Sequence, residues 1–460
     1  ALREEGLRTV LINPNVAICY HPQVSDRLLD DALAIIGRGY THPAIYNDDL
    51  ISKGLVQAGV APDDAHLYQN VTCVEIAPIG NADVQVGAAT IYPAKTLELV
   101  LAGGAETVAD ERFADLTGDE LHDALPRPVG SGGVTADLDS IGSFDAFLSV
   151  YLAALSNTIR ACMGRAIDDE YRRSAFGSNP LTSCFTDDCI ERGTDACAGG
   201  ARYHYCGANV AGFSTTVDAL AAIEHAVFTE RRVGLSELAG VLRDDFAGHD
   251  VLRHYLVNRC PKYGNDDRRP DELAERLVGF MHTEVSRYRT AKGGRFYLGI
   301  FSGWGGADEG RYRGAHVSHG ARTGATADGR RARAPLSENI GPVAGADRSG
   351  VTAMLNSILK LDHSIGLGGI SVNCRMDPSL LRDRASRSRV ADLVRVFMKQ
   401  GGFELQFNCV DRATLVAARE HPEEYQSLTV RVAGYSDYFG RLTDAQQQEI
   451  IERTEYSTLG

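Results

Sequence analysis

Three residues of this chain, Cys73, Glu75 and Gly434, have side chains or backbone groups that could together handle hydrogen atoms. A cysteine thiol can exchange its hydrogen atom reversibly with carbon. The carboxylate two residues further on would project from the same side of an extended loop and could accept a proton. A glycine Cα flanked by an amide nitrogen and a carbonyl can delocalise an unpaired electron, and the missing side chain lets that centre become planar.

Each of these residues also has an ordinary structural explanation. Residues 428–432 alternate between apolar and polar side chains, which is typical of a half-buried strand. A glycine that follows a strand usually supplies a turn, and a lone cysteine is usually a small buried apolar residue. Glu75 could form a salt bridge within its own loop. Because Cys73 and Gly434 are far apart in the sequence, only the fold could bring them together.

Longer stretches around these residues favour the chemical interpretation. The sequence RVAGYS at residues 431–436 resembles the C-terminal signature of the glycyl radical enzymes, and NVTCVE at residues 70–75 resembles the Cys-Val-Glu loop of that family. The resemblance covers nearly the whole chain, since further stretches are similar to the family at residues 188–195, 199–203, 262–266, 328–330, 334–337, 355–363 and 407–411.

The resemblance implies a role for each residue. Gly434 would store the radical, Cys73 would become the thiyl radical that takes a hydrogen atom from a small organic substrate, and Glu75 would remove a substrate proton. No bound cofactor is expected. A radical S-adenosylmethionine activase would install the glycyl radical, and Arg431, Tyr435 and Ser436 are candidates for its recognition, with ordinary packing as the alternative.

The neighbours of Cys73 bear on which reaction this would be. The pyruvate formate-lyase type has two adjacent cysteines, whereas Cys73 is flanked by Thr72 and Val74, so formate C-acetyltransferase activity is the disfavoured alternative. The diol-dehydratase type is expected to carry a His-Asp pair thirteen and fourteen residues beyond the cysteine, where this chain has Val86 and Gly87. Elimination or decarboxylation on another small substrate remains, which predicts a lyase.

A competing hypothesis of another class rests on the segment from Cys184 to Cys206, which also contains Cys189, Cys197 and His204. These residues could make the chain a metal-binding module, or an inactive remnant that only shares ancestry with the enzymes. Their gaps differ from the close pairs of ordinary zinc sites, so the main interpretation includes no metal.

Composition narrows the function further. The 460 residues include 47 basic and 61 acidic ones, and the net charge of −14 argues against nucleic-acid and anionic-membrane binding. No apolar run approaches the roughly 20 residues needed to cross a bilayer, and no leader is expected. The ten cysteines form no dense framework, which suits a reducing compartment. A cytoplasmic enzyme is the expectation.

The pattern of elements predicts an α/β architecture with parallel strands. We expect helices over residues 25–36 with Ser25 as N-cap, 97–101 and 216–228, and one that begins with the capping box of Thr443 and Gln446. We expect strands over residues 9–12, 71–79, 296–301 and 403–410, and glycine-rich loops at 130–133 and 303–310.

The resemblance implies a ten-stranded α/β barrel, built from two five-stranded halves, with the cysteine and glycine loops at its centre. Only 72 residues precede Cys73, whereas relatives carry several hundred, so the N-terminal half is expected to be missing. A separate chain or a homodimer could supply it. We expect two domains, a barrel portion over residues 1–315 with the cysteine loop and a glycine radical domain over residues 316–460.

Overall fold

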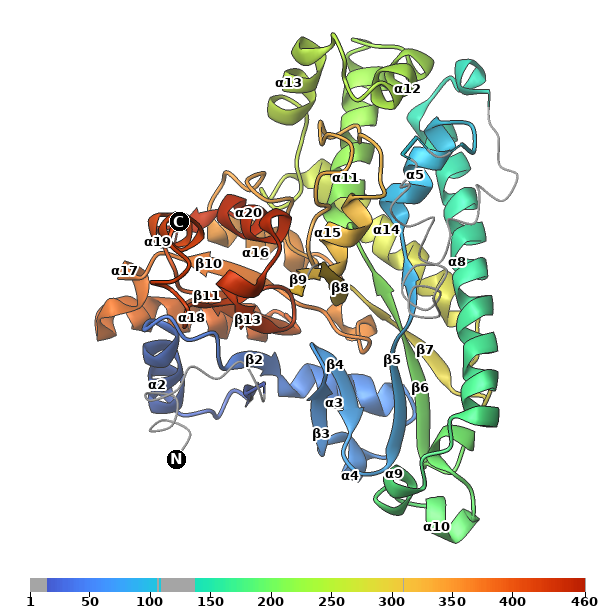
Figure 1. Cartoon of the computed structure of the whole chain (residues 1–460), viewed down its shortest axis with the longest axis vertical. Helices are drawn as coiled ribbons and strands as arrows, with labels where there is room; N and C mark the ends of the chain where they lie inside the picture. Colours follow the sequence, from blue (N-terminus) through green and yellow to red (C-terminus); the bar gives the residue numbers. More distant parts are fainter. Residues whose placement is uncertain (1–14, 106, 109–136, 309, 460) are drawn as a thin grey trace.

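The structure is a computed structural model, and it describes residues 15–105, 107–108, 137–308 and 310–459. The expected strand at residues 9–12 and the expected loop at residues 130–133 lie outside these ranges. The described residues form an α/β protein in which helices surround two sheets (Figure 1).

Two sheets form the centre of the molecule. The larger has the strand order β1-β2-β11-β10-β14, with β2 and β11 antiparallel and the other neighbours parallel. The smaller is parallel, with the order β5-β6-β7. The strands are β1 (Ala17–Tyr20), β2 (Ala44–Asn47), β5 (Ala82–Ile91), β6 (Tyr203–Val210), β7 (Arg295–Gly299), β10 (Asn373–Met376), β11 (Glu404–Asn408) and β14 (Glu455–Tyr456).

A single parallel bridge between Ile300 and Ile370 joins the end of β7 to the segment before β10. The described strands therefore form two linked sheets, and a closed ten-stranded barrel is not seen among them. The α/β class predicted from the sequence is confirmed.

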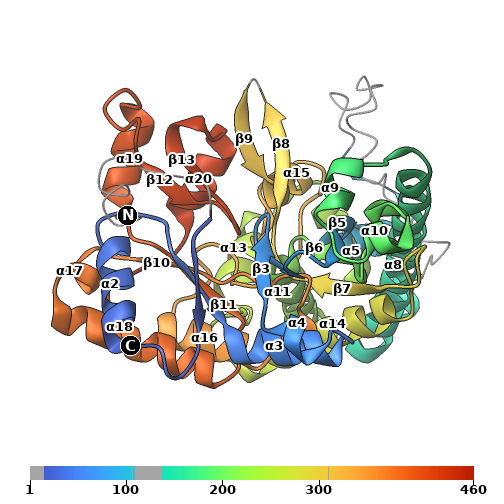
Figure 2. The same ribbon diagram turned by 90° about the horizontal axis from the view of Figure 1, so that it is seen from below.

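Three antiparallel hairpins stand outside the sheets: β3 (Tyr68–Val71) with β4 (Glu75–Pro78), β8 (Trp304–Asp308) with β9 (Arg311–Gly314), and β12 (Thr429–Arg431) with β13 (Ser436–Tyr438). The β3–β4 hairpin lies between the C-terminal segment and the three-stranded sheet in both views (Figures 1 and 2).

Helices cover the outer faces of both sheets. The larger ones are α2 (Asp26–Ile36), α3 (Asp48–Gln57), α5 (Pro93–Leu101), α8 (Phe144–Phe176), α11 (Phe213–Ile223), α12 (Leu235–Arg243), α13 (Asp250–Asn258), α14 (Arg268–Ser286), α16 (Val351–Leu359), α18 (Arg384–Lys399), α19 (Arg412–Glu420) and α20 (Asp444–Glu452). Shorter ones are α4 (Pro62–Ala65), α9 (Pro180–Cys184), α10 (Cys189–Arg192), α15 (Ala315–Gly320) and α17 (Ser379–Arg382).

The long helix α8 is the one described helix that is long and apolar enough to cross a membrane, with a mean hydropathy of 1.3 over its most apolar window. The search for apolar runs in the sequence missed this stretch. The window is 44% buried, and α8 packs against α5, α14 and β5, as a core helix does. One such helix is weak evidence for a membrane span.

Most of the elements expected from the sequence are present. Ser25 caps α2 by accepting a hydrogen bond from the Leu28 amide, although Leu28 itself is 48% exposed rather than part of the buried face. The helices expected at residues 97–101 and 216–228 correspond to α5 and α11. Thr443 caps α20, but the predicted capping box is incomplete, because the Thr443 amide donates to the Tyr312 carbonyl rather than to Gln446. The strands expected at residues 296–301 and 403–410 correspond to β7 and β11.

Two expectations were wrong. Residues 71–79 do not form one strand, because a turn at Thr72 with φ of 54° reverses the chain into the β3–β4 hairpin. Residues 303–310 are not simply a loop, because β8 lies within them and pairs with β9. In both places the chain forms an antiparallel hairpin, where a single strand and a loop had been expected. The alternation of apolar and polar residues in a strand does not reveal where the chain turns back.

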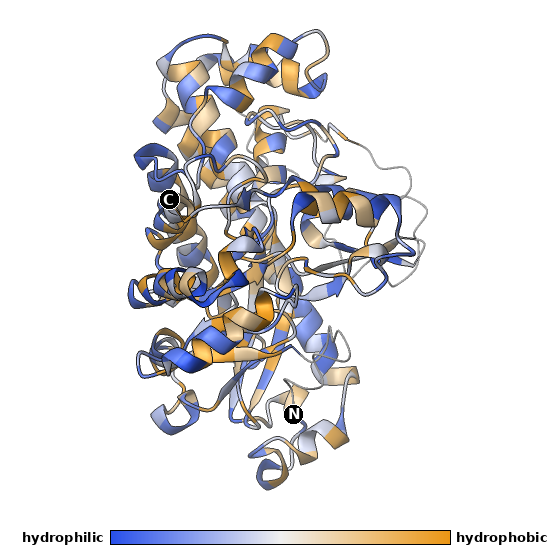
Figure 3. Ribbon diagram, turned by 90° about the vertical axis from the view of Figure 1, so that its left-hand side faces the viewer, coloured by the Kyte–Doolittle hydropathy of each residue, from blue (hydrophilic) through white to orange (hydrophobic). Residues whose placement is uncertain are grey.

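Among the described residues, buried apolar side chains form one large core, a smaller one in the C-terminal segment, and a cluster of three residues, Cys189, Ala196 and Ala201. The hydropathy colouring shows apolar residues concentrated along the central strands and on the inner sides of helices (Figure 3). The smaller core consists of Val410, Leu415, Ala418, Val430, Val432, Phe439, Leu442, Ile450 and Ile451. This second core supports the β12–β13 hairpin. The expected division between residues 315 and 316 falls within α15, after its first residue, and stays a prediction.

Candidate active site

Cys73 lies at the tip of the β3–β4 hairpin, which we call the cysteine hairpin. Val71 pairs with Glu75, and the three residues between them form the turn. The Glu75 carboxylate closes this turn, because its Oε2 accepts hydrogen bonds from Thr72 Oγ1 at 2.8 Å, the Val74 amide at 3.2 Å and the Cys73 amide at 3.3 Å. A side chain of the hairpin itself therefore fixes the position of Cys73.

Gly434 lies at the tip of the β12–β13 hairpin, which we call the glycine hairpin. Arg431 pairs with Ser436, and the Val432 amide donates to the Tyr435 carbonyl at 2.9 Å across the four-residue tip. Gly434 is buried. The alternating strand before the glycine is thus confirmed, but its residues are buried on both faces.

The two hairpins meet tip to tip. A methyl group added to Gly434 would lie 2.6 Å from Cys73 Cβ and 2.9 Å from Val74 Cγ1, distances that real side chains do not adopt. Val74 in turn packs against Gly369, where a methyl group would lie 2.7 Å from Val74 Cγ2. The fold brings Cys73 and Gly434 into direct contact, and only glycine fits at position 434.

Polar bridges join the hairpins to each other and to the larger sheet. Asn15 donates to the Thr72 carbonyl at 2.8 Å and accepts from Arg431 Nη1 at 3.3 Å, so one side chain links both hairpins. The Tyr46 hydroxyl, on β2, donates to the Cys73 carbonyl at 3.4 Å.

Side chains from other elements hold the carbonyl groups of the glycine hairpin. Asn408 Nδ2 donates to the Arg431 carbonyl at 2.9 Å, and Arg453 donates to the Arg431 carbonyl at 3.1 Å and the Val432 carbonyl at 2.6 Å. Gln406 Nε2 donates to the Ala433 carbonyl. Three consecutive carbonyls before Gly434 are therefore fixed by distant residues.

The surroundings of Cys73 keep its thiol protonated. Burial, reinforced by the nearby Glu75 carboxylate, raises the pKa of Cys73 to about 12. Burial also raises the pKa of Glu75, although the hydrogen bonds to its carboxylate oppose this. A thiol that stays protonated at neutral pH carries the hydrogen atom that an exchange with Gly434 requires.

The three residues expected to contact an activase are packed within the molecule in this conformation. Arg431 is 1% exposed and donates to Ser436 Oγ at 3.3 Å, and Ser436 is also buried. Tyr435 is half-buried. Their role in recognition stays a prediction.

The sequence analysis gave no individual role to Asn15, Gln406, Asn408 or Arg453. A signal for two of them was present, because polar residues occupy every second position of the apolar segment 403–410, at Glu404, Gln406 and Asn408. Alternate residues of a strand share a face. A polar face on a strand that is otherwise buried indicates specific polar partners, which here belong to the glycine hairpin.

The cysteines between residues 184 and 206 do not form one site. Cys184 is exposed, and among the described residues the ligand atoms that converge are those of Glu170, His204 and Cys206. His204 lies between the carboxylates of Glu170 and Asp83, with Nδ1 3.1 Å from Asp83. Burial lowers the pKa of His204, but these carboxylates outweigh it and raise the pKa to about 10. In this structure the His204 imidazole is paired with carboxylates.

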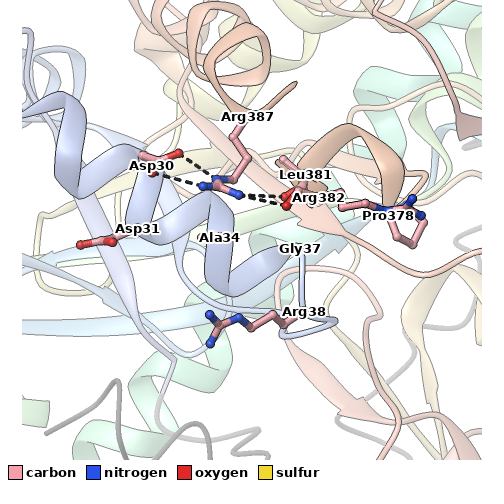
Figure 4. Close-up of a pocket in the computed structure, with 9 residues that line it drawn as sticks. All are labelled: Asp30, Asp31, Ala34, Gly37, Arg38, Pro378, Leu381, Arg382 and Arg387. Atoms are coloured by element: carbon pink, nitrogen blue, oxygen red, sulfur yellow. Dashed lines mark hydrogen bonds and ion pairs between the residues drawn. The ribbon is translucent and has the colours of Figure 1, made fainter. Parts of the chain in front are cut away.

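A hollow in the surface lies between α2 and the segment containing α17 and α18 (Figure 4). Across it, Arg387 donates to both carboxylate oxygens of Asp30, at 2.8 and 3.3 Å. None of its lining residues belongs to the cysteine or glycine hairpin, so this hollow is not part of the candidate active site.

Comparison with known proteins assigns the chain to a family. The model of the "Pyruvate formate lyase-like" family matches residues 5–303, and the "Glycine radical" model matches residues 336–440. The chain belongs to the pyruvate formate lyase-like family of glycyl radical enzymes.

Several members of this glycyl radical enzyme family are similar over almost all of the chain. The probable dehydratase YbiW of Escherichia coli (strain K12) is 33% identical over 99% of this chain and 54% of its own length. The trans-4-hydroxy-L-proline dehydratase of Clostridioides difficile is 32% identical over 97% of this chain and 53% of its own length. The chain thus spans about half the length of the curated relatives it matches.

Solved structures of the family agree with the fold. The glycerol-bound B12-independent glycerol dehydratase from Clostridium butyricum superposes with a TM-score of 0.86 at 30% identity, over 99% of this chain and 54% of that one. A Roseburia inulinivorans structure of 1,2-propanediol dehydration has a TM-score of 0.85 at 31% identity, over 97% of this chain and 53% of that one.

Proposed function

We propose that this chain carries the radical relay of a glycyl radical lyase, with Gly434 as the radical store and Cys73 as the residue that reacts with a small organic substrate. The contact between the two hairpin tips supports this most strongly, because hydrogen-atom transfer requires near contact. The raised pKa of the Cys73 thiol, which keeps it protonated, supports it further.

The proposed steps conserve atoms and electrons. The Gly434 radical takes the hydrogen atom of the Cys73 thiol, leaving a thiyl radical. The thiyl radical takes a hydrogen atom from a substrate carbon, the hydroxyl on that carbon gives its proton to Glu75, and the substrate radical expels its leaving group as an anion that receives this proton. The product radical then recovers a hydrogen atom from Cys73, and Cys73 recovers its own from Gly434.

Glu75 is the proposed base that removes the substrate hydroxyl or ammonium proton. The hydrogen bonds described for Glu75 all involve Oε2, which leaves Oε1 as the oxygen for substrate. The same hydrogen bonds also fit an alternative, in which Glu75 has no catalytic role and only stabilises the turn.

Elimination from a small hydroxylated substrate is the reaction class we favour. The relatives at 32 to 33% identity are named as dehydratases, whereas the indoleacetate decarboxylase of Tractidigestivibacter scatoligenes is 26% identical. Decarboxylation is therefore the second candidate. Acetyl transfer stays disfavoured, because Cys73 is flanked by Thr72 and Val74.

Partners are part of the proposal. A radical S-adenosylmethionine activase would form the glycyl radical, and a second chain or a second copy would enclose the site within a ten-stranded barrel. In support, Cys73 is only half-buried and Thr72 is exposed, so the described residues leave the cysteine hairpin reachable from solvent. Protection of Cys73 from alkylation when a candidate partner chain is added would test this enclosure.

Electron paramagnetic resonance after anaerobic treatment with such an activase and S-adenosylmethionine tests the radical store. The native chain should give a doublet from the one hydrogen left on Gly434. Gly434→Ala should give none, because its methyl group would collide with Cys73. Gly440→Ala is the matched control, since nothing lies within 4 Å of a methyl group there. An undiminished doublet in Gly434→Ala would place the radical elsewhere.

A further inference from the structure

The peptide group between Ala433 and Gly434 has a buried hydrogen-bond donor aimed at it. Gln406, on β11, is fully buried, and its Nε2 donates to the Ala433 carbonyl. This carbonyl belongs to the same peptide group as the nitrogen of Gly434. Of the polar contacts to the glycine hairpin described above, this one is nearest to the proposed radical centre.

Gln406 is itself held by a chain of polar groups. Its Nε2 also lies within hydrogen-bond distance of Asn373 Oδ1 and of Ser371 Oγ, the latter at 2.7 Å, so three acceptors share its two hydrogens. Asn373 Nδ2 donates to Glu338 Oε2 at 2.7 Å, and the other carboxylate oxygen of Glu338 lies 3.7 Å from Arg453 Nη1. A buried ion pair is thereby connected through two amides to the peptide group of Gly434.

The orientation of the Gln406 amide follows from its neighbours. Reversing it would place its carbonyl oxygen against the Ala433 and Asn373 oxygens, both of which are acceptors. The NH₂ group therefore faces Ala433. In a buried site of low dielectric, consecutive hydrogen bonds strengthen one another.

We propose that Gln406 is a positioning residue for the radical store, which fixes the plane of the Ala433–Gly434 peptide group and polarises its carbonyl. This rests on the proposed function of Gly434. An unpaired electron on the Gly434 Cα is shared with its amide nitrogen. A hydrogen bond to the Ala433 carbonyl draws the lone pair of that nitrogen into the peptide group, which lowers the spin density on nitrogen and keeps the group planar.

The variant Gln406→Met removes the donor while nearly preserving the side-chain volume. Gln447→Met is the matched control, because Gln447 is also buried and its Nε2 donates to a carbonyl of the same segment, that of Phe439, at 2.9 Å. In the part of the chain that the structure describes, the Gln447 side chain hydrogen-bonds to Phe439 and not to residues 431–434. Gln406→Met thus removes the donor to the Ala433 carbonyl, whereas Gln447→Met removes the donor to the Phe439 carbonyl.

The first measurement needs no radical. In resting protein labelled with ¹³C′-alanine and ¹⁵N-glycine, the Ala433–Gly434 signal is identified by its loss in Gly434→Ala. The Ala433 ¹³C′ resonance should move upfield in Gln406→Met and stay in place in Gln447→Met. An unmoved resonance in Gln406→Met, or an equal shift in both variants, would overturn the proposal. The other Ala-Gly signals report whether each variant is folded.

A second variant covers the case in which Gln406→Met does not fold. Gln406→Glu keeps the side-chain shape, but its carboxyl group can donate only when protonated. The Ala433 resonance should therefore return toward its native position as the pH falls. A resonance that does not respond to pH in this variant would contradict the proposal.

In activated protein, Gln406→Met should show a larger ¹⁵N hyperfine coupling at Gly434 and a glycyl radical that decays about five- to tenfold faster, the size expected for one lost hydrogen bond. Gln447→Met should match the native chain. Native coupling and lifetime in Gln406→Met would overturn the inference. Failure of the native chain to form any radical would instead count against the proposed function, and the resting-state measurement would still decide the role of Gln406.

Discussion

The cysteine and glycine hairpins meet at their tips, yet they are held in place in different ways. Glu75, two residues from Cys73, closes the turn of the cysteine hairpin. The glycine hairpin is instead fixed by Gln406, Asn408 and Arg453, which lie on β11 and just beyond α20. The turn of the first is closed by its own side chain, with further contacts from Asn15 and Tyr46, whereas the second depends on the packing of the C-terminal segment.

Because of this difference, substitutions in the two regions should have different effects. Changes near Cys73 should alter the chemistry and leave the glycine hairpin intact. Changes at distant residues such as Arg453 should alter the glycine hairpin and leave the turn around Cys73 intact. Variants of each kind can therefore test the comparison.

The largest expected effect is that of Cys73→Ser. Turnover should be lost, because a hydroxyl hydrogen is too strongly bound for reversible exchange with carbon, while the Gly434 doublet should still form. Turnover and spin concentration measured on one sample check this. Cys184→Ser, at an exposed cysteine, should change neither. Turnover in Cys73→Ser would move the thiyl role to another cysteine.

Arg453→Met should destabilise the glycine hairpin strongly. Arg453 is buried and bonds both carboxylate oxygens of Glu449 at 2.8 Å. Removing it leaves Glu449 and Glu338 without their cation, a change that typically costs about 3–5 kcal/mol. Urea unfolding, with hydrogen exchange of residues 429–438, would show the loss.

Arg441→Met is the control for Arg453→Met, since Arg441 is half exposed and lies 3.7 Å from Asp437. Such surface pairs contribute about 1 kcal/mol or less. Equal losses in the two variants would mean that the buried pair is not what holds the glycine hairpin.

Glu75→Gln should lower product formation by about 10²-fold, the usual effect of losing a positioned base, while the Gly434 radical still forms. Because the pKa of Glu75 is raised, the native rate should fall as the pH drops through that pKa, and the variant should lack this dependence. Glu237→Gln, at an exposed carboxylate that caps a backbone amide, is the control. Full activity in Glu75→Gln would leave Glu75 a purely structural role.

The smallest expected effect is that of Asn15→Ala, which removes the bridge between the hairpins. Loss of hydrogen bonds worth roughly 1 kcal/mol corresponds to about fivefold less turnover per radical, with an unchanged radical yield. Kinetic assays normalised to spin concentration measure this, with Asn258→Ala on α13 as a control. Unchanged turnover would show that the tips stay aligned without Asn15.

The sequence was sufficient to predict the α/β class and the residues of both tips. Short motifs pointed to Cys73 and Gly434 because the chemistry proposed for them requires particular residue types in a fixed local order. The turn at Thr72 was missed, because strand periodicity continues across a tight hairpin whose turning residue is not glycine.

The supporting residues of the glycine hairpin could not be predicted in the same way. Arg453 follows α20 and Asn15 precedes β1, and nothing in the local sequence of either indicates which carbonyl it will contact. Long-range hydrogen bonds depend on how elements pack. The polar positions at Glu404, Gln406 and Asn408 were the one visible sign of these partners.

Hydrogen exchange between Gly434 and solvent tests the contact of the two tips most directly. The thiol hydrogen of Cys73 exchanges with water, so in D₂O a Gly434 radical that trades hydrogen atoms with Cys73 acquires deuterium at its Cα. The account predicts that the native doublet collapses toward a single line in D₂O, and that it persists in Cys73→Ser. A native doublet that persists in D₂O, or a doublet that collapses equally in Cys73→Ser, would contradict the relay between these two residues.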